Sequence, residues 1–297
     1  NRRPLPRATT LALRNAYALL GNPPGVSFTS PGVDPSAGLN SPVFVESDPS
    51  AELVVTVCRR LAAQVEAGSR LAVAELLPPT GEALWSTHST DGMTTTVGDA
   101  GGRPVSLGFT ELTPHWLVSG RSDGSRSAFL TNALLGLTAR YGPEELTLYL
   151  VDLGDGESFV EFLQTERDRS WIPQVRAAAM TADREYVRDL FEQLAVEVRR
   201  REEAGRRAGG QRFAALREHT PLPRIVCVLD NVPLLFAERD RLSADIASRL
   251  DTLARSGRTY GVHLVLAGAG DLGLAGRSDG GHRDSLLGQF PVRVALP

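Results

Sequence analysis

The sequence predicts an α/β protein with a mainly parallel central sheet flanked by helices. Short, continuously apolar segments have the composition of strands that are buried on both faces. We expect these strands at 116–119, 146–153, 224–229, 262–267 and 291–296. Helical patterns separate them, at 127–141, 184–205 and 243–256. Alternation of strands and helices is typical of parallel sheets covered on both sides.

Composition excludes some classes of function. The 297 residues are 42% hydrophobic and 23% charged, with a formal net charge of -3, which gives no overall attraction to nucleic acid or to anionic membranes. All 32 basic residues are arginines. No apolar run approaches the ~18 residues of a membrane span, and two isolated cysteines fit a reducing compartment. We therefore expect a cytoplasmic chain. It begins at Asn1 without a signal-peptide pattern, so we expect a piece of a longer parent chain, and this expectation is compatible with a membrane-associated parent.

The first 70 residues are expected to form an N-terminal extension or connector, and residues 71–297 the main domain. Within the extension, an amphipathic pattern predicts a short helix over 10–20 and a longer one over 50–67. Proline, glycine and serine predict a loop over 22–42. A small hairpin is expected from strands at 94–97 and 104–109.

The segment 116–130 reads as a strand, a glycine-rich turn and a helix. This is the layout of a phosphate-binding P-loop, G-x-x-x-x-G-K-[ST]. Gly120 and Ser127 occupy the first and last positions, but Ser125 replaces the second glycine and Arg126 replaces the lysine. Backbone N–H groups and a helix N-terminus favour anions at such a turn. The residues expected to bind a nucleotide are Gly120, Asp123, Gly124, Ser125, Arg126 and Ser127.

The substitutions in this loop weaken the nucleotide hypothesis. Ser125 adds a side chain where the backbone must approach phosphates closely. Arg126 is bulkier and planar where a compact ammonium is needed, although a guanidinium still suits phosphate recognition. Asp123 adds a negative charge near the expected phosphates. The alternative is a glycine-rich turn that binds nothing.

The strand expected at 224–229 leads into Asp230, which has the form of a Walker B motif. Asp230 and Ser127 are the expected Mg²⁺ ligands, with Asp230 also in a catalytic role. Hydrolytic motors usually place a glutamate after this aspartate, but here it is Asn231, whose amide cannot act as a general base. The alternative is a buried strand that ends in a turn-forming Asp-Asn pair.

Several further segments carry a resemblance to a known family. They are 114–120, 140–146, 148–152, 223–230, 253–264 and 288–293. In this order they resemble the motor domain of FtsK/SpoIIIE-type translocases of the HerA–FtsK group, over about three quarters of the chain. The resemblance implies a RecA-like P-loop NTPase fold, hexameric rings, and ATP hydrolysis that moves double-stranded DNA. Related motors drive type VII protein secretion, and some of their tandem domains carry degenerate sites.

The chain departs from the family pattern at the positions that bind phosphate and catalyse hydrolysis. The loop lacks its glycine and lysine, Asn231 replaces the glutamate, and only small residues follow the strand at 262–267, where the family often has a polar sensor. Arg258, with Arg255 nearby, lies where the family places basic residues near a subunit interface. The resemblance implies an arginine finger in the catalytic machinery of a neighbouring site. The alternative is a solvated helix end.

Three hypotheses follow. The first is a motor-family domain of a DNA- or protein-translocating assembly that still binds ATP and Mg²⁺, with weak or absent hydrolysis. The second is a pseudo-ATPase that acts as a scaffold or recruits a substrate. The third, an active DNA translocase, is the least supported, because positioning and electrostatics supply most phosphoryl-transfer catalysis. Expected partners are double-stranded DNA or a translocated protein, and either copies of the chain in a ring or an active motor domain.

Overall fold

The computed structural model describes residues 11–14, 17–20, 41–44, 49–69, 76–78, 84–100, 103–166, 168–209, 212–270, 272 and 286–297. The chain divides into two compact units, Asn1–Ser69 and Arg70–Pro297.

The first unit contains a small antiparallel sheet of β1 (Leu11–Arg14), β2 (Tyr17–Leu20) and β3 (Ser41–Phe44), in that order. The helix expected over 10–20 is therefore wrong. An isolated helix of that length is marginal without packing, and the same segment forms backbone hydrogen bonds as two paired strands instead. Most of the loop expected over 22–42 lies outside the described residues. The second expected helix is confirmed as α1 (Ala51–Ser69), where the Ser50 hydroxyl accepts from the N–H of Leu53 at 3.3 Å.

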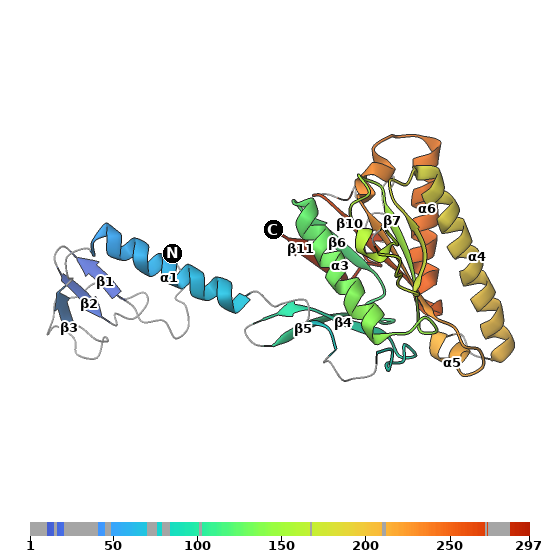
Figure 1. The fold of residues 1–297 in the computed structure, drawn as a ribbon, viewed down its shortest axis with the longest axis horizontal. Coiled ribbons are helices and arrows are strands. Elements are labelled where there is room, and N and C mark those ends of the chain that lie inside the picture. The colour runs from blue at the N-terminus through green and yellow to red at the C-terminus, as the bar shows by residue number, and fades with distance from the viewer. Residues whose placement is uncertain are drawn as a thin grey trace. The chain divides into compact units, whose positions relative to one another are not determined.

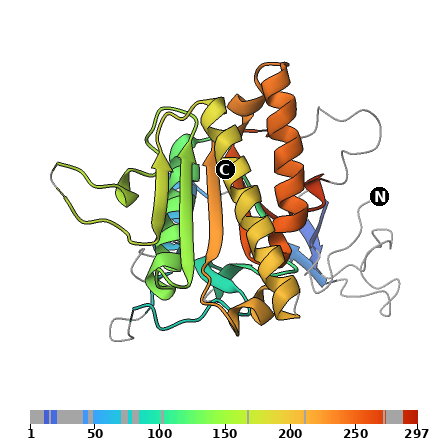
Figure 2. The same ribbon diagram turned by 90° about the vertical axis from the view of Figure 1, so that its right-hand side faces the viewer.

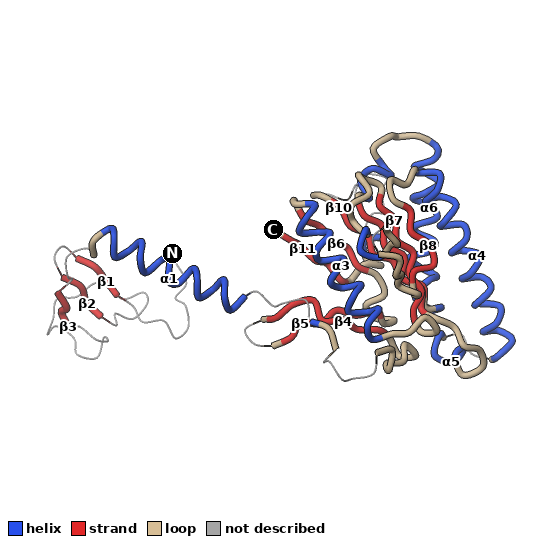
Figure 3. Tube along the Cα trace, viewed as in Figure 1, coloured by secondary structure: helices blue, strands red, loops and turns tan. Residues whose placement is uncertain are grey.

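A six-stranded, fully parallel sheet forms the centre of the second unit (Figures 1 and 3). Its order is β11-β6-β10-β9-β7-β8. The strands are β6 (Trp116–Gly120), β7 (Leu146–Asp152), β8 (Val175–Ala179), β9 (Arg224–Asp230), β10 (Val262–Gly268) and β11 (Val292–Leu296). The predicted α/β class is confirmed. The sequence missed β8, whose short run of small residues has no strong strand pattern.

Helices cover both faces of this sheet, as Figure 2 shows. On one face lies α3 (Asp123–Arg140), which packs on β6 and on the hairpin of β4 (Met93–Asp99) and β5 (Pro104–Phe109). On the other face, α4 (Arg184–Ala208) packs against α6 (Arg241–Ser256). The predicted hairpin and helices are confirmed. Shorter elements are α5 (Phe213–Arg217), η1 (Val160–Phe162), η2 (Val232–Phe236) and η3 (Gly257–Tyr260).

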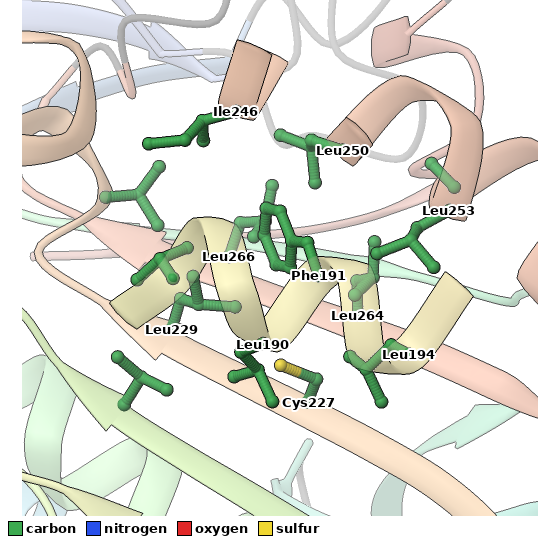
Figure 4. Close-up of a cluster of buried hydrophobic side chains, with 14 of the residues drawn as sticks. Leu190, Phe191, Leu194, Cys227, Leu229, Ile246, Leu250, Leu253, Leu264 and Leu266 are labelled. Carbon is green, nitrogen blue, oxygen red and sulfur yellow. The ribbon is translucent and has the colours of Figure 1, made fainter. Parts of the chain in front are cut away.

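Two apolar clusters hold the layers together. One joins α4 and α6 to β9 and β10, and Figure 4 shows Phe191 of α4 and Leu250 of α6 above Cys227 of β9. The other packs α3 and the hairpin against the opposite face through Trp116, Leu130 and neighbouring residues. Burial raises the pKa of Cys227, which therefore packs as a neutral thiol. The sheet is thus fixed independently of any ligand at its edge.

Two buried histidines lie at the end of the sheet where the strands begin. His115 Nε2 donates to the carbonyl of Ala254 at 2.9 Å, and His115 Nδ1 accepts from the N–H of Leu264 at 2.9 Å. His263 Nδ1 donates to the carbonyl of Pro114, and its Nε2 accepts from Arg224. Each ring is fully hydrogen-bonded only when neutral. Burial lowers the pKa of His115 to about 4 and that of His263 well below its usual range.

These histidines predict acid sensitivity of the fold. Because their folded-state pKa values are depressed, the unfolded chain binds more protons, and stability is lost as pH falls below about 6.5. We expect His115 alone to remove about 2 kcal/mol of unfolding free energy between pH 7 and pH 5. Urea unfolding at the two pH values measures this. His115→Gln should flatten the dependence; equal slopes in the original protein and in this variant contradict the assignment.

Two glycines separate the effect of backbone strain from that of packing. Gly209 and Gly261 both follow helices with φ of 73°, but a Cβ at Gly261 would lie 2.5 Å from the ring of Phe213, whereas nothing lies within 4 Å at Gly209. We expect Gly209→Ala to cost about 1 kcal/mol from the left-handed backbone alone. Gly261→Ala should cost about 1–3 kcal/mol more, since it also overpacks the core. Denaturant unfolding compares the variants, and equal losses would show that the ring of Phe213 moves aside freely.

Candidate functional site

The candidate site lies where four neighbouring strands end. Gly120 ends β6, Asp152 ends β7, Asp230 ends β9 and Gly268 ends β10. Asp152 and Asp230 are direct register partners on adjacent strands. Carboxyl ends of parallel strands are the usual place for ligands in α/β proteins.

The loop expected to cradle phosphates is largely helical. Helix α3 begins at Asp123, four residues before the predicted start, because Ser122 caps it. The Ser122 hydroxyl accepts from the N–H of Ser125 at 3.4 Å, and its carbonyl accepts from the N–H of Arg126 at 3.2 Å. Two N–H groups of the predicted cradle are therefore bonded within the helix. A Cβ added at Gly124 would meet only the Ser122 hydroxyl, at 3.8 Å, whereas one added at Gly120 would lie 3.1 Å from Leu296 of β11.

Arg126 points into the protein and is fully buried. Its Nε donates to Asp230 Oδ1 at 2.5 Å, and its Nη2 donates to Asn231 Oδ1 at 2.8 Å. The same Nη2 lies 2.8 Å from Asp123 Oδ1. Burial acts to lower the pKa of Arg126, but the hydrogen bond and charge of Asp230 outweigh it, and the pKa is raised. The guanidinium is thus a permanent cation bonded to Asp230.

Both carboxylate oxygens of Asp230 are occupied by groups of the chain itself. Oδ1 accepts from Arg126 and from the backbone N–H of Asn231, and Oδ2 accepts from the Ser158 hydroxyl at 2.6 Å. The Ser127 hydroxyl donates to Ser158 Oγ at 3.4 Å. The two expected Mg²⁺ ligands, Ser127 and Asp230, are therefore brought together, but through Ser158 and beside a guanidinium.

Asp152 organises the loop after β7. Its Oδ1 accepts from the N–H of Gly154 at 2.7 Å and from Asn231 Nδ2 at 3.1 Å, and its Oδ2 accepts from the N–H groups of Gly156 and Ser158. Burial acts to raise the pKa of Asp152, but these hydrogen bonds outweigh it and the pKa is lowered. Asp152 thus stays ionised and fixes Asn231 and Ser158 in place.

A pocket of about 420 Å³ opens over this network. Its lining is Asp123, Gly124, Ser127, Gly154, Asp155, Glu157, Ser158, Asn231, Pro233, Leu234 and Ala269. Among the residues that the structure describes, the lining carries three carboxylates and no basic side chain, and the guanidinium of Arg126 is already paired with Asp230. Such a surplus of negative charge repels polyphosphates.

The arrangement does not fit Mg²⁺ and ATP. A metal ion at Asp230 would have to displace Arg126 and then lie beside its charge. Among the described residues, no group of three or more His, Cys, Asp or Glu side chains is arranged to hold a metal. Asn231 offers an amide in place of a general base. We therefore derive no hydrolytic step at this site.

Arg258 lies away from the pocket. It is exposed on η3, just before β10 begins, and its charge acts on His115 at the start of β6. This is the end of the sheet opposite Asp230. The structure does not bring Arg258 to the site of its own chain, and its role toward a neighbouring subunit stays a prediction.

Sequence reasoning missed two residues of the site, Asp152 and Ser158. The available signal was a strand ending in aspartate, followed by a glycine-rich and acidic segment. That signal does not reveal that β7 pairs with β9, which is the pairing that places Asp152 beside Asp230.

Comparison with known proteins agrees with this architecture. Residues 75–218 match the model of the FtsK/SpoIIIE family. The ESX secretion system protein EccC of Thermomonospora curvata is 30% identical over 184 residues, which are 57% of this chain and 13% of EccC. The DNA translocase FtsK of Corynebacterium glutamicum is 28% identical over 165 residues, 52% of this chain and 17% of that protein. This chain thus spans a small part of these relatives.

A solved structure extends the match. The cytoplasmic domain of the Thermomonospora curvata type VII secretion ATPase EccC superposes with a TM-score of 0.53 at 27% identity, covering 76% of this chain and 25% of that one. The fold is that of RecA-like P-loop ATPase domains, and residues 75–218 are similar to the FtsK/SpoIIIE family. No helix among the described residues combines the length and apolarity needed to cross a membrane.

The ion pair between Arg126 and Asp230 predicts unequal costs for two similar substitutions. Asp230→Asn leaves a buried guanidinium without its main counter-charge, and we expect a loss of about 3–5 kcal/mol in unfolding free energy. Asp123→Asn removes an ion pair whose carboxylate is 78% exposed, and should cost less than about 1 kcal/mol. Denaturant unfolding measures both. Comparable small losses would show that Asp230 is not needed to neutralise Arg126.

Proposed function

We propose that this chain is a non-hydrolysing domain of a DNA- or protein-translocating assembly, a pseudo-ATPase that keeps the architecture of a motor without its chemistry. The observation that carries the proposal is the closed ion pair of Arg126 with Asp230. The residue expected to bind phosphate and the residue expected to bind Mg²⁺ neutralise each other.

Three further features support the loss of hydrolysis. The side-chain amide of Asn231 cannot act as a general base, and it is already hydrogen-bonded to Arg126 and Asp152. Ser122 caps α3 and holds N–H groups that a phosphate would need. The pocket walls carry Asp123, Asp155 and Glu157, which oppose the approach of a polyphosphate.

Similarity to the FtsK/SpoIIIE family supports a place in a translocating assembly. The relatives include an ESX secretion protein and a DNA translocase, so either cargo is compatible with the family. In the proposal the domain acts as a scaffold, within a ring of its own copies or beside an active motor domain. The solved relative is a cytoplasmic domain, which supports a cytoplasmic position here.

The proposal predicts no turnover. Phosphate release from ATP and Mg²⁺ by the full chain should lie at least roughly 10³-fold below the typical enzyme rate of about 10 s⁻¹. It should equal the release by Asp230→Asn prepared in the same way, since any residual signal then comes from contaminants. Calorimetric titration with millimolar ATP and Mg²⁺ should show no binding heat. Turnover that disappears in Asp230→Asn would refute the proposal.

A further inference from the structure

The oxygen atoms around the guanidinium of Arg126 form a set of ligands that also suits a divalent metal cation. Its guanidinium is held by Asp230 Oδ1, Asn231 Oδ1 and Asp123 Oδ1, at 2.5, 2.8 and 2.8 Å. Two of these are carboxylate oxygens and one is an amide oxygen. The hydroxyls of Ser127 and Ser158 lie next to them in the same network. Carboxylate, amide and hydroxyl oxygens are the ligands that hard divalent cations prefer.

The protein requires a positive charge at this point. Asp230 and Asp152 are fully buried, and each takes part in the same hydrogen-bonded network. Backbone and amide donors satisfy Asp152, whereas Asp230 has Arg126 as its charged partner. A buried carboxylate without a cation is strongly unfavourable. A divalent ion at Asp230 and the guanidinium of Arg126 would repel each other at short range, so one excludes the other.

Resting on the proposed function, we infer that Arg126 is a built-in replacement for a divalent cation at this site. The guanidinium joins α3 to the end of β9 directly and, through Asn231, to Asp152 of β7. These are three elements that a bound metal and nucleotide would otherwise connect. The site is thus held in one arrangement without a ligand, and a divalent cation gains access only when this charge is removed.

A matched pair of substitutions tests the charge. Arg126→Gln removes the cation but keeps an amide that can donate to Asp230, whereas Arg126→Lys keeps the cation. The probe is Mn²⁺ alone, followed by electron paramagnetic resonance of the free ion and by thermal unfolding of the full chain. We expect Arg126→Gln to bind about one Mn²⁺ per chain and to gain roughly 2–4 °C in melting temperature with excess Mn²⁺. The original protein and Arg126→Lys should show neither effect.

Adding Asp230→Asn to Arg126→Gln should abolish Mn²⁺ binding. This loss would show that the ion binds at the carboxylate of Asp230. A folded Arg126→Gln that binds no Mn²⁺ overturns the inference, because the oxygens are then not a cation site. If Arg126→Gln does not fold even with Mn²⁺, Mn²⁺ binding is measured on the original protein. No bound Mn²⁺ in the original protein supports exclusion of the ion by Arg126. Mn²⁺ binding that is lost in Asp230→Asn overturns the inference. Mn²⁺ binding at Asp230 by the original protein, without ATP turnover, would overturn the inference and leave the proposed function intact.

Discussion

The buried ion pair between Arg126 and Asp230 is the constraint on which the site depends. Either charge alone in this interior would be strongly destabilising, so the two must meet with good geometry. That requirement fixes the first turn of α3 against the end of β9. The other groups then satisfy what remains: Ser158 takes the second oxygen of Asp230, and Asn231 shares Nη2 of Arg126 with Asp123. The start of α3 at Asp123 fits this arrangement, because the segment before Ser127 does not have to stay an open loop that binds a phosphate.

The apolar core of the fold and the pocket of the site are built from different residues of this chain. The two apolar clusters that hold helices on the sheet contain none of the pocket-lining residues, and their buried members come mostly from strand interiors and helix faces. Charges at the strand ends are therefore free to change while the scaffold persists. The pocket has kept its position at the carboxyl end of the sheet and has the opposite electrostatic character to a phosphate site.

Much of the fold follows from periodicity, and part of the site follows from motif spacing. The apolar runs of β9 and β10 are unmistakable because both faces are covered, whereas the segment of β1 and β2 has a length and pattern that suit either a helix or a hairpin. Motif spacing placed Arg126 and Asp230 after two strands, β6 and β9, that end at the same edge of the sheet. It gave no indication that Arg126 turns inward, since that depends on the pairing of β7 with β9 and on Ser158, contributed by a different loop.

The changes at the site depend on one another physically. Asn231 has φ of 60°, a left-handed conformation that asparagine tolerates better than most residues. Its oxygen accepts from Arg126 while its nitrogen donates to Asp152. A glutamate here would adopt this conformation less readily and would set a second carboxylate against the buried Asp152, where only a donor fits. An arginine that reaches Asp230 and an amide that joins it to Asp152 therefore form one arrangement, and the catalytic base is incompatible with it.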